Sequence, residues 1–297
     1  MNQQVIVDII DSLMKPLGDY ARLMRLDRPI GIWLLLWPTL WGLWIAADGH
    51  PDSTIFAVFV TGVIVMRSAG CVFNDFADRK LDPLVARTKH RPLAAGTTTP
   101  IEALALCAAL LMVALGLALT LNRLTLLLAL GGAVLTLIYP FAKRYFAAPQ
   151  FILGAAFGWA IPMAFAAQTG TVPQLGWLMW LAVVIWAVCY DTMYAMADRN
   201  DDLKIGIKST AILFGQADVF IVGMLQLTLL FALKLIGDQA GLGGWYSLSL
   251  LAAAAMMIYQ LVLIRERVPD KCFAAFLNNR HIGAVVFAGI FLDYALV

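Results

Sequence analysis

Long apolar stretches recur along the whole 297-residue chain, and short polar segments separate them. A stretch of about 18 or more mostly apolar residues is typical of a membrane-spanning helix, because roughly 20 helical residues cross the hydrocarbon core of a bilayer. The pattern therefore predicts an all-α, polytopic membrane protein with nine transmembrane helices. The nine stretches are 29–47, 54–73, 103–121, 124–142, 150–167, 174–190, 219–236, 245–264 and 282–297.

The composition is also that of a membrane protein. Hydrophobic residues make up 62% of the chain and charged residues 13%, whereas soluble domains are about half apolar and about one quarter charged. No Gly- or Ser-rich linker interrupts the apolar stretches, so we expect a single membrane domain over residues 1–297. Lys234 and Asp293 fall in the seventh and ninth stretches, where charges are unfavourable.

The Lys and Arg residues indicate an orientation, because basic residues accumulate in cytosolic loops. If the N-terminus is cytosolic, each of the 21 basic residues except Arg67, Arg123 and Lys234 lies on the cytosolic side. Residues 1–28 then form a cytosolic N-terminal segment. The net charge of +2 reflects a basic inner face, which favours anionic lipids or an anionic substrate and gives no reason to expect nucleic-acid binding.

The N-terminal segment also bears on localisation. Asp8, Asp11 and Asp19 are interspersed with its basic residues, whereas mitochondrial transit peptides are rich in Arg and poor in acidic residues. No small-residue cleavage site precedes the first apolar stretch, so we expect no leader to be removed. The segment therefore favours a multi-pass protein of the bacterial inner membrane.

The acidic residues gather in two segments. Of the 19 acidic residues 17 are Asp, and seven of these lie in NDFADRKLD from Asn74 and DTMYAMADRNDD from Asp191. Residues three, four and seven positions apart share a helical face, so each segment predicts one acidic stripe. The stripes comprise Asn74, Asp75, Asp78 and Asp82, and Asp191, Tyr194, Asp198 and Asp202. Corresponding positions are 116 residues apart, and both segments follow stretches that end on the cytosolic face.

Acidic stripes of this kind favour a bound cation. Like charges on one helical face are destabilising, and Mg²⁺ usually binds through a few carboxylates together with substrate phosphates. Several basic residues on the same predicted membrane face could contact phosphate oxygens that the metal does not use; they are Arg79, Lys80, Arg87, Lys89, Lys143, Arg144, Lys204 and Lys208. The residues alone therefore predict a metal-bound polyanion. Helix caps and interfacial ion pairs are the alternative for the acids, and the cytosolic bias of basic residues is the alternative for each base.

Arg67 is the one basic residue at membrane depth inside the second stretch. It precedes Asn74 by seven residues, which places it two helical turns deeper on the same face. A charge at this depth indicates a functional site, because its burial is costly. The alternative is an Arg that snorkels or pairs with a neighbouring helix.

The two segments match complete motifs of the form NDxxDxxxD and DxxYxxxD. On these motifs the chain resembles the UbiA superfamily of membrane prenyltransferases over nearly its full length, including the nine-helix layout. Within it the chain is most similar to the 4-hydroxybenzoate polyprenyltransferases. The similar stretches are RLDRPIG (25–31), MRSAGCVFND (66–75), YPFAKR (139–144) and YDTMYAMADRNDDLKIGIKSTAILFG (190–215).

The resemblance implies Mg²⁺-dependent transfer of a polyprenyl group from polyprenyl diphosphate to the ring carbon ortho to the hydroxyl of 4-hydroxybenzoate, in ubiquinone biosynthesis. The expected metal ligands are Asn74, Asp78, Asp82, Asp198 and Asp202. The expected diphosphate contacts are Arg28, Asn74, Lys143, Arg144, Tyr194 and Lys204. Asp75 and Asp191 are expected to ligate or orient during catalysis. Arg67 is expected to bind either the diphosphate or the benzoate carboxylate.

Two other functions remain open from the sequence. A cation-coupled transporter would also place acids in membrane helices, but transporter sites lie near the bilayer midplane, whereas both acidic segments follow their stretches. A prenyltransferase with another acceptor, such as a naphthoate, a haem or a lipid alcohol, would carry the same two motifs.

Overall fold

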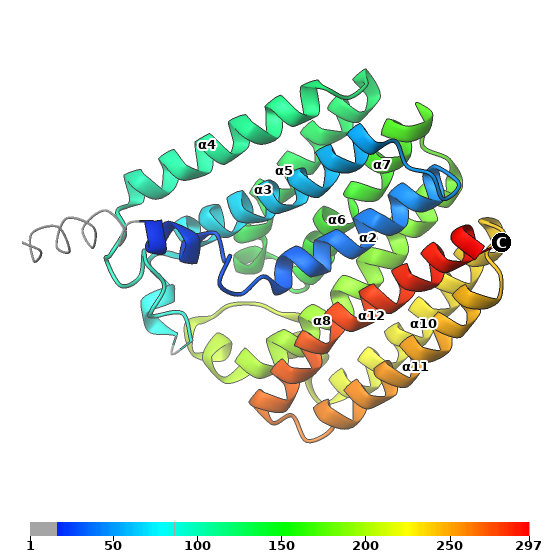
Figure 1. Ribbon diagram of the computed structural model, residues 1–297. Coiled ribbons are helices and arrows are strands. Elements are labelled where there is room, and N and C mark those ends of the chain that lie inside the picture. The colour runs from blue at the N-terminus through cyan, green and yellow to red at the C-terminus, as the bar shows by residue number, and fades with distance from the viewer. Residues whose placement is uncertain (1–16, 86, 297) are drawn as a thin grey trace, which may run out of the picture.

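The computed structural model of this chain describes residues 17–85 and 87–296, except for the side chain of Lys143. Every regular element in this part is a helix (Figure 1). Residues 17–23 are helical, and α2 (Ile30–Ala46), α3 (Ser53–Asp78), α4 (Pro100–Leu119) and α5 (Arg123–Tyr145) come after them. They are followed by α6 (Gln150–Gly158), α7 (Ala160–Thr169), α8 (Gln174–Ile205), α9 (Thr210–Phe214), α10 (Asp218–Gln239), α11 (Gly244–Ile264) and α12 (Pro269–Leu296). Two 3-10 turns, η1 (Asp82–Leu84) and η2 (Gly215–Ala217), follow α3 and precede α10.

The helices confirm the predicted all-α membrane architecture. Within the described residues, 8 segments are long and apolar enough to cross a membrane, and α2 is a shorter apolar helix. Each of the nine predicted stretches overlaps one of these segments. The number of spans and the cytosolic N-terminus stay predictions.

The stretch predicted as one helix at 150–167 is broken into α6 and α7 at Trp159. Pro162 explains the break, because it has no backbone N–H to donate to the carbonyl of Gly158. Trp159 is anchored at this point by a 2.7 Å hydrogen bond from its indole nitrogen to the carbonyl of Leu128 on α5.

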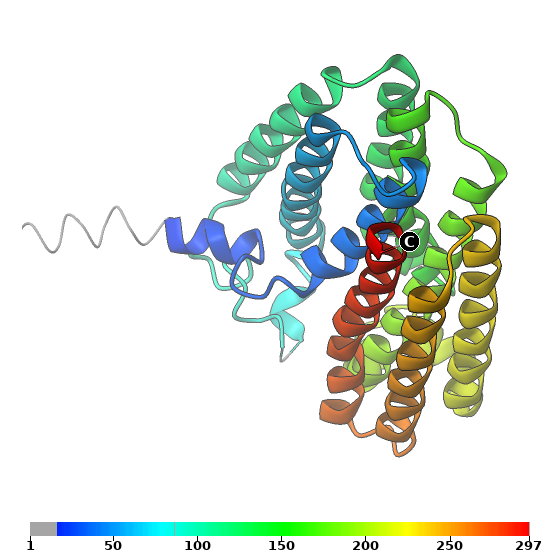
Figure 2. The same ribbon diagram turned by 45° about the vertical axis from the view of Figure 1, so that its right-hand side comes forward.

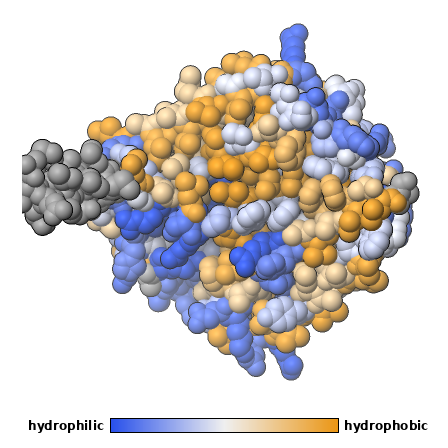
Figure 3. Space-filling model, viewed as in Figure 1, coloured by the Kyte–Doolittle hydropathy of each residue, from blue (hydrophilic) through white to orange (hydrophobic). Residues whose placement is uncertain are grey.

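Helix α8 is the centre of the bundle and packs against α6, α10 and α12 (Figures 1 and 2). In its most apolar stretch 61% of the residues are buried, against 11% in α4, which instead exposes Met112 and Leu119. Gly154 lets α6 approach α8 closely, because a Cβ there would lie 2.9 Å from the backbone of Val184. Hydrophobic residues accordingly cover the upper part of the surface, over α3 and α4 (Figure 3).

Lys234 and Asp293, the charges in the seventh and ninth predicted stretches, are accommodated near helix ends. Asp293 on α12 accepts hydrogen bonds from the backbone nitrogens of Gly243, Trp245 and Tyr246 at 2.8, 3.2 and 2.9 Å, so it caps the start of α11. Lys234 pairs with Asp238, four residues further along α10.

Both aspartate segments lie on helices that continue beyond the predicted apolar stretches. Helix α3 continues from residue 73 to Asp78, and α8 continues from residue 190 to Ile205. We call this side of the bundle, where α3 and α8 end, the aspartate end. Asp82 departs from the predicted stripe, because α3 ends before it and Asp82 begins η1. The following Pro83 accounts for this, since the residue before a proline is disfavoured in a helix.

Candidate active site

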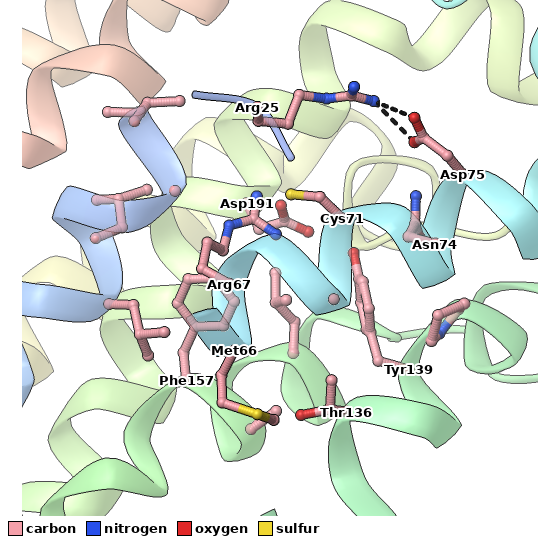
Figure 4. A pocket seen from close by; sticks show the side chains of 18 of the residues that line it. Arg25, Met66, Arg67, Cys71, Asn74, Asp75, Thr136, Tyr139, Phe157 and Asp191 are labelled. Carbon is pink, nitrogen blue, oxygen red and sulfur yellow. Dashed lines mark hydrogen bonds and ion pairs between the residues drawn. The ribbon is translucent and has the colours of Figure 1, made fainter. Parts of the chain in front are cut away.

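A cavity of about 900 Å³ lies between the two aspartate segments (Figure 4). Its lining on α3 recurs every four residues from Val58 to Asp78, so one face of this helix borders the cavity over about 30 Å. Charged residues line the aspartate end. Apolar residues, including Leu111 on α4 and Leu130 on α5, line the remainder.

Asp75 is held by two arginines from different segments. The Arg25 Nη2 donates to both Asp75 carboxylate oxygens at 2.7 and 2.8 Å, and Arg91 Nη1 donates to Oδ1 at 3.0 Å. Only 1% of the Asp75 side chain is exposed. Figures 1 and 2 show why the three residues meet: the N-terminal segment and the loop after α3 both fold against the aspartate end of α3.

Arg25 adopts a strained backbone conformation to reach Asp75. Its φ is 58°, in the left-handed region that residues with a side chain rarely occupy. Such a conformation costs on the order of 1–3 kcal/mol and persists only where surrounding contacts impose it. The ion pair with Asp75, in which Arg25 Nη2 contacts both carboxylate oxygens, is one such contact.

Arg91 joins Asp82 to the same cluster. Its Nη1 lies 3.1 Å from both carboxylate oxygens of Asp82, so η1 stays electrostatically connected to α3 although it is outside that helix. Burial raises the pKa of Asp82, an effect that Arg91 opposes and that Asp75 reinforces. Burial disfavours the charged form of Arg91, but Asp75 and Asp82 outweigh it and raise the pKa of Arg91.

Asp78, at the end of α3, faces α5. Arg144 lies 3.5 Å from the Asp78 carboxylate and donates a 2.7 Å hydrogen bond to the carbonyl of Ala77. The neighbouring Lys143 has its side chain outside the described part of the structure.

The second aspartate segment has its own arginine. Arg87, in the loop after α3, forms an ion pair with Asp198. Its guanidinium also lies over the ring of Tyr194 at 4.2 Å and over that of Phe273 at 5.6 Å. Guanidinium groups stack on aromatic faces and bind planar anions. The carboxylate and the two rings therefore hold the Arg87 guanidinium at the aspartate end of the cavity.

Arg67 lies deeper, where α3 faces α2, α6 and α8. Its guanidinium lies 5.6 Å from the ring centroid of Phe157, and within the described part of the chain its buried Nε has no hydrogen-bond partner. Figure 4 shows Arg67 in the same part of the cavity as Asp191 and the Tyr139 hydroxyl. Gly31 makes room for Arg67, since a Cβ at residue 31 would lie 2.6 Å from its Cζ.

Most of the predicted site residues line this single cavity. They are Arg28, Arg67, Asn74, Asp75, Asp78, Asp82, Asp191, Tyr194, Asp198 and Asp202. Lys204 lies elsewhere: it is 73% exposed and pairs with Asp201 at 3.1 Å. Arg144 reaches the site only through Asp78.

Sequence reasoning missed Arg25 and Arg91 as site residues. Arg25 stood out only as part of the RLDRPIG similarity, and Arg91 only as one of several basic residues in a polar loop. Both residues lie in non-helical segments, so neither belongs to a periodic pattern along the sequence. They reach Asp75 only because these segments fold back against α3.

The acidic residues offer the hard oxygen ligands that Mg²⁺ prefers, but no preformed cage. Among the described residues, no group of three or more His, Cys, Asp or Glu side chains is placed to hold a metal ion. Mg²⁺ commonly uses one or two carboxylates and completes its octahedron with water and substrate phosphates. Two facing aspartate segments surrounded by arginines fit a metal that arrives with a polyanion.

Comparison with known proteins gives one consistent result. The model of the UbiA prenyltransferase family matches residues 35–283. The 4-hydroxybenzoate octaprenyltransferase of Methylococcus capsulatus is 59% identical over 275 residues, which cover 93% of this chain and 94% of that protein.

Solved structures agree in fold. A UbiA homologue from Aeropyrum pernix superposes with a TM-score of 0.79 at 25% identity, over 88% of this chain and 97% of that one. A UbiA homologue from Archaeoglobus fulgidus bound to GPP and Mg²⁺ superposes with a TM-score of 0.69 at 20% identity, over 94% of this chain and 100% of that one.

Proposed function

This chain belongs to the UbiA prenyltransferase family, and from that premise we propose that it transfers a polyprenyl group to 4-hydroxybenzoate. The donor is polyprenyl diphosphate, the new bond is made to the ring carbon ortho to the hydroxyl, and the product serves ubiquinone biosynthesis. One observation carries the proposal: both aspartate segments border a single cavity that is charged at one end and apolar along the rest of α3.

The diphosphate binds at the aspartate end. Asn74, Asp78, Asp82, Asp198 and Asp202 would hold Mg²⁺, which when bound neutralises charge on the departing diphosphate. Arginine guanidinium groups suit the remaining phosphate oxygens, because their planar fork binds two oxygens at once. Arg87, Arg91 and Arg28 line this end of the cavity; Arg28 is 79% exposed and well placed for first contact.

Asp75 contributes by holding cations rather than by contacting the donor. Its oxygens are engaged by Arg25 and Arg91, and this arrangement fixes both guanidinium groups beside the diphosphate. Preorganised positive groups stabilise the charge that develops on a leaving group without having to rearrange during the reaction.

The acceptor binds deeper, against Arg67. A benzoate carboxylate is a planar anion that a guanidinium can bind through two oxygens, and the buried Nε of Arg67 has no hydrogen-bond partner among the described residues. This position is about 10 Å from Asn74 along α3, so carboxylate and diphosphate occupy separate places. Asp191 borders the same part of the cavity (Figure 4) and is the group we assign to accept the proton released from the acceptor.

The apolar part of the cavity takes the prenyl chain. Valine, leucine and phenylalanine side chains on α3, α4 and α5 exclude water there. Water exclusion protects an allylic cation from hydrolysis until the electron-rich ring attacks it. The chain is a multi-pass membrane protein, and the basic residues around the aspartate end favour a cytosol-facing active site in a bacterial inner membrane.

The alternatives have less support. An ion-transport site is expected near the bilayer midplane, whereas Asp75 and Asp78 lie in the last turn of α3 and Asp198 and Asp202 in the last two turns of α8. A lipid-alcohol acceptor is disfavoured because it has no carboxylate for the Arg67 Nε, which has no hydrogen-bond partner among the described residues. A naphthoate or a haem is disfavoured by the 59% identity to a 4-hydroxybenzoate octaprenyltransferase.

The test is a prenylation assay on purified protein with Mg²⁺, polyprenyl diphosphate and a panel of aromatic acids, with products identified by mass. Prenylated 4-hydroxybenzoate is the expected main product, and Asp78→Ala and Asp198→Ala are expected to abolish it. Preference for another acceptor, or wild-type turnover by either folded variant, would refute the assignment.

A further inference from the structure

A second ionic cluster lies beside α8, on a face next to the one that borders the cavity. Asp218 at the start of α10 is fully buried, and it forms ion pairs with Arg199 on α8 and with Arg267 between α11 and α12. Neither arginine lines the cavity, and no step of the proposed reaction uses them.

The register of α8 connects this cluster to the active site. Asp191 and Asp198 are seven residues apart and border the cavity. Thr192 and Arg199 each follow one of them by one residue, so they form a parallel stripe rotated by about 100° around the helix. The rotation of α8 therefore sets both stripes together.

The second stripe is bound to the segment that follows α8. The Arg199 Nη2 donates to the carbonyls of Ala211 and Gly215 at 2.6 and 3.4 Å, in addition to pairing with Asp218. The Thr192 hydroxyl lies 2.6 Å from that of Thr210. Helix α9 and η2 thus contact this stripe of α8 along two turns.

Arg267 closes the cluster from the third side. Its Nε donates to the two Asp218 oxygens at 3.0 and 3.2 Å, and its Nη2 donates to the carbonyl of Gln216 at 2.9 Å. Arg267 holds a φ of 56° to do so, in the left-handed region. A buried carboxylate and a strained backbone both cost stability unless surrounding contacts offset the cost, and here those contacts connect α8, the start of α10 and the turn before α12.

We propose that Asp218 is a positioning residue for the second aspartate segment: by holding Arg199, it fixes the rotation of the end of α8 that carries Asp198 and Asp202. This inference rests on the proposed function. A rotation of about 20° would move a side-chain tip about 5 Å from the helix axis by about 2 Å. Mg²⁺ tolerates little deviation from its ligand distances, so such a shift would impair metal binding without removing any ligand.

The experiment compares Asp218→Asn with the wild type in the purified full-length protein. Removing the charge is expected to raise the Mg²⁺ concentration for half-maximal activity about 10- to 100-fold, with a smaller change in KM for 4-hydroxybenzoate. Thr192→Val removes one hydroxyl from the same stripe and is expected to shift the Mg²⁺ requirement in the same direction by less. If Asp218→Asn fails to fold, the Mg²⁺ requirement of Thr192→Val decides whether the positioning role stands.

The matched control is Asp293→Asn, which removes the charge of another buried aspartate, the cap of α11 at the opposite end of the bundle. It is expected to lower the thermal unfolding temperature without changing the Mg²⁺ requirement. An unchanged Mg²⁺ requirement in folded Asp218→Asn, or an equal shift in Asp293→Asn, would overturn the positioning role.

A second readout separates this inference from the proposed function. Mn²⁺ binding in the presence of inorganic diphosphate, followed by electron paramagnetic resonance, needs no turnover. Weaker Mn²⁺ binding by Asp218→Asn than by the wild type supports the positioning role of Asp218, even if 4-hydroxybenzoate is not the acceptor. Equal Mn²⁺ binding by the two proteins refutes that role. If the wild type neither binds Mn²⁺ nor prenylates, the proposed function itself fails.

Discussion

Gly31→Ala offers a test of Arg67 that leaves every charged group in place. A Cβ at residue 31 would lie 2.6 Å from the Arg67 Cζ, whereas carbon atoms in ordinary contact are about 3.5–4.0 Å apart. The guanidinium must therefore move by about 1 Å or more. Because it is the end of a flexible side chain, it can move without unfolding α2 or α3.

The displacement is expected to weaken acceptor use selectively. A misplacement of about 1 Å in a positioning group can cost about 100-fold in rate, so we expect kcat/KM for 4-hydroxybenzoate to fall by about that factor. The KM for polyprenyl diphosphate is expected to change little, because the donor binds at the aspartate end. The thermal unfolding temperature is also expected to stay close to that of the wild type.

The assay is steady-state prenylation with 4-hydroxybenzoate and with 4-hydroxybenzamide, which lacks the carboxylate. The wild type is expected to prefer the acid strongly, and both Gly31→Ala and Arg67→Ala are expected to lose that preference. Gly116→Ala on α4 is the control, since a Cβ there meets nothing within 4 Å. If Gly31→Ala keeps the wild-type preference for the acid, Arg67 does not bind the acceptor carboxylate.

Three further outcomes follow from the site. Chelation by EDTA is expected to abolish turnover, and added Mg²⁺ to restore it; activity in EDTA would contradict a metal-bound diphosphate. Arg87→Met removes a charged contact worth about 2 kcal/mol, so KM for the donor is expected to rise about 30-fold, while Lys204→Met, outside the cavity, leaves it unchanged. Gly62 borders the apolar part of the cavity and a Cβ there meets nothing within 4 Å; Gly62→Phe is expected to slow long donors while sparing geranyl diphosphate, as product analysis by mass would show.

The sequence predicted what depends on local pattern. Apolar length located the helices, and the spacing of Asp191, Tyr194 and Asp198 placed them on one face of α8, where all three border the cavity. The helical-spacing rule was wrong for Asp82, because residues share a helical face only while the helix continues. Pro83 follows Asp82, and α3 ends before it.

Partners across the fold were beyond prediction. Arg87 and Lys204 are both basic residues near an aspartate segment, yet Arg87 pairs with Asp198 over the cavity and Lys204 pairs with Asp201 outside it. The difference depends on the rotation of α8 and on how the loop after α3 folds back. Neither is encoded in the spacing of charges along the chain.

The two ionic clusters on α8 have a common physical logic. Burying a carboxylate costs several kcal/mol unless cations and hydrogen bonds compensate it, and well-packed apolar residues would often be equally stable. Asp198 borders the cavity, so its cost is explained by metal and diphosphate binding. Asp218 does not line this cavity and is fully buried. Apolar packing is a poor source of directional contacts that fix the rotation of a helix. The ion pairs of Asp218 with Arg199 and Arg267 supply such a contact for α8.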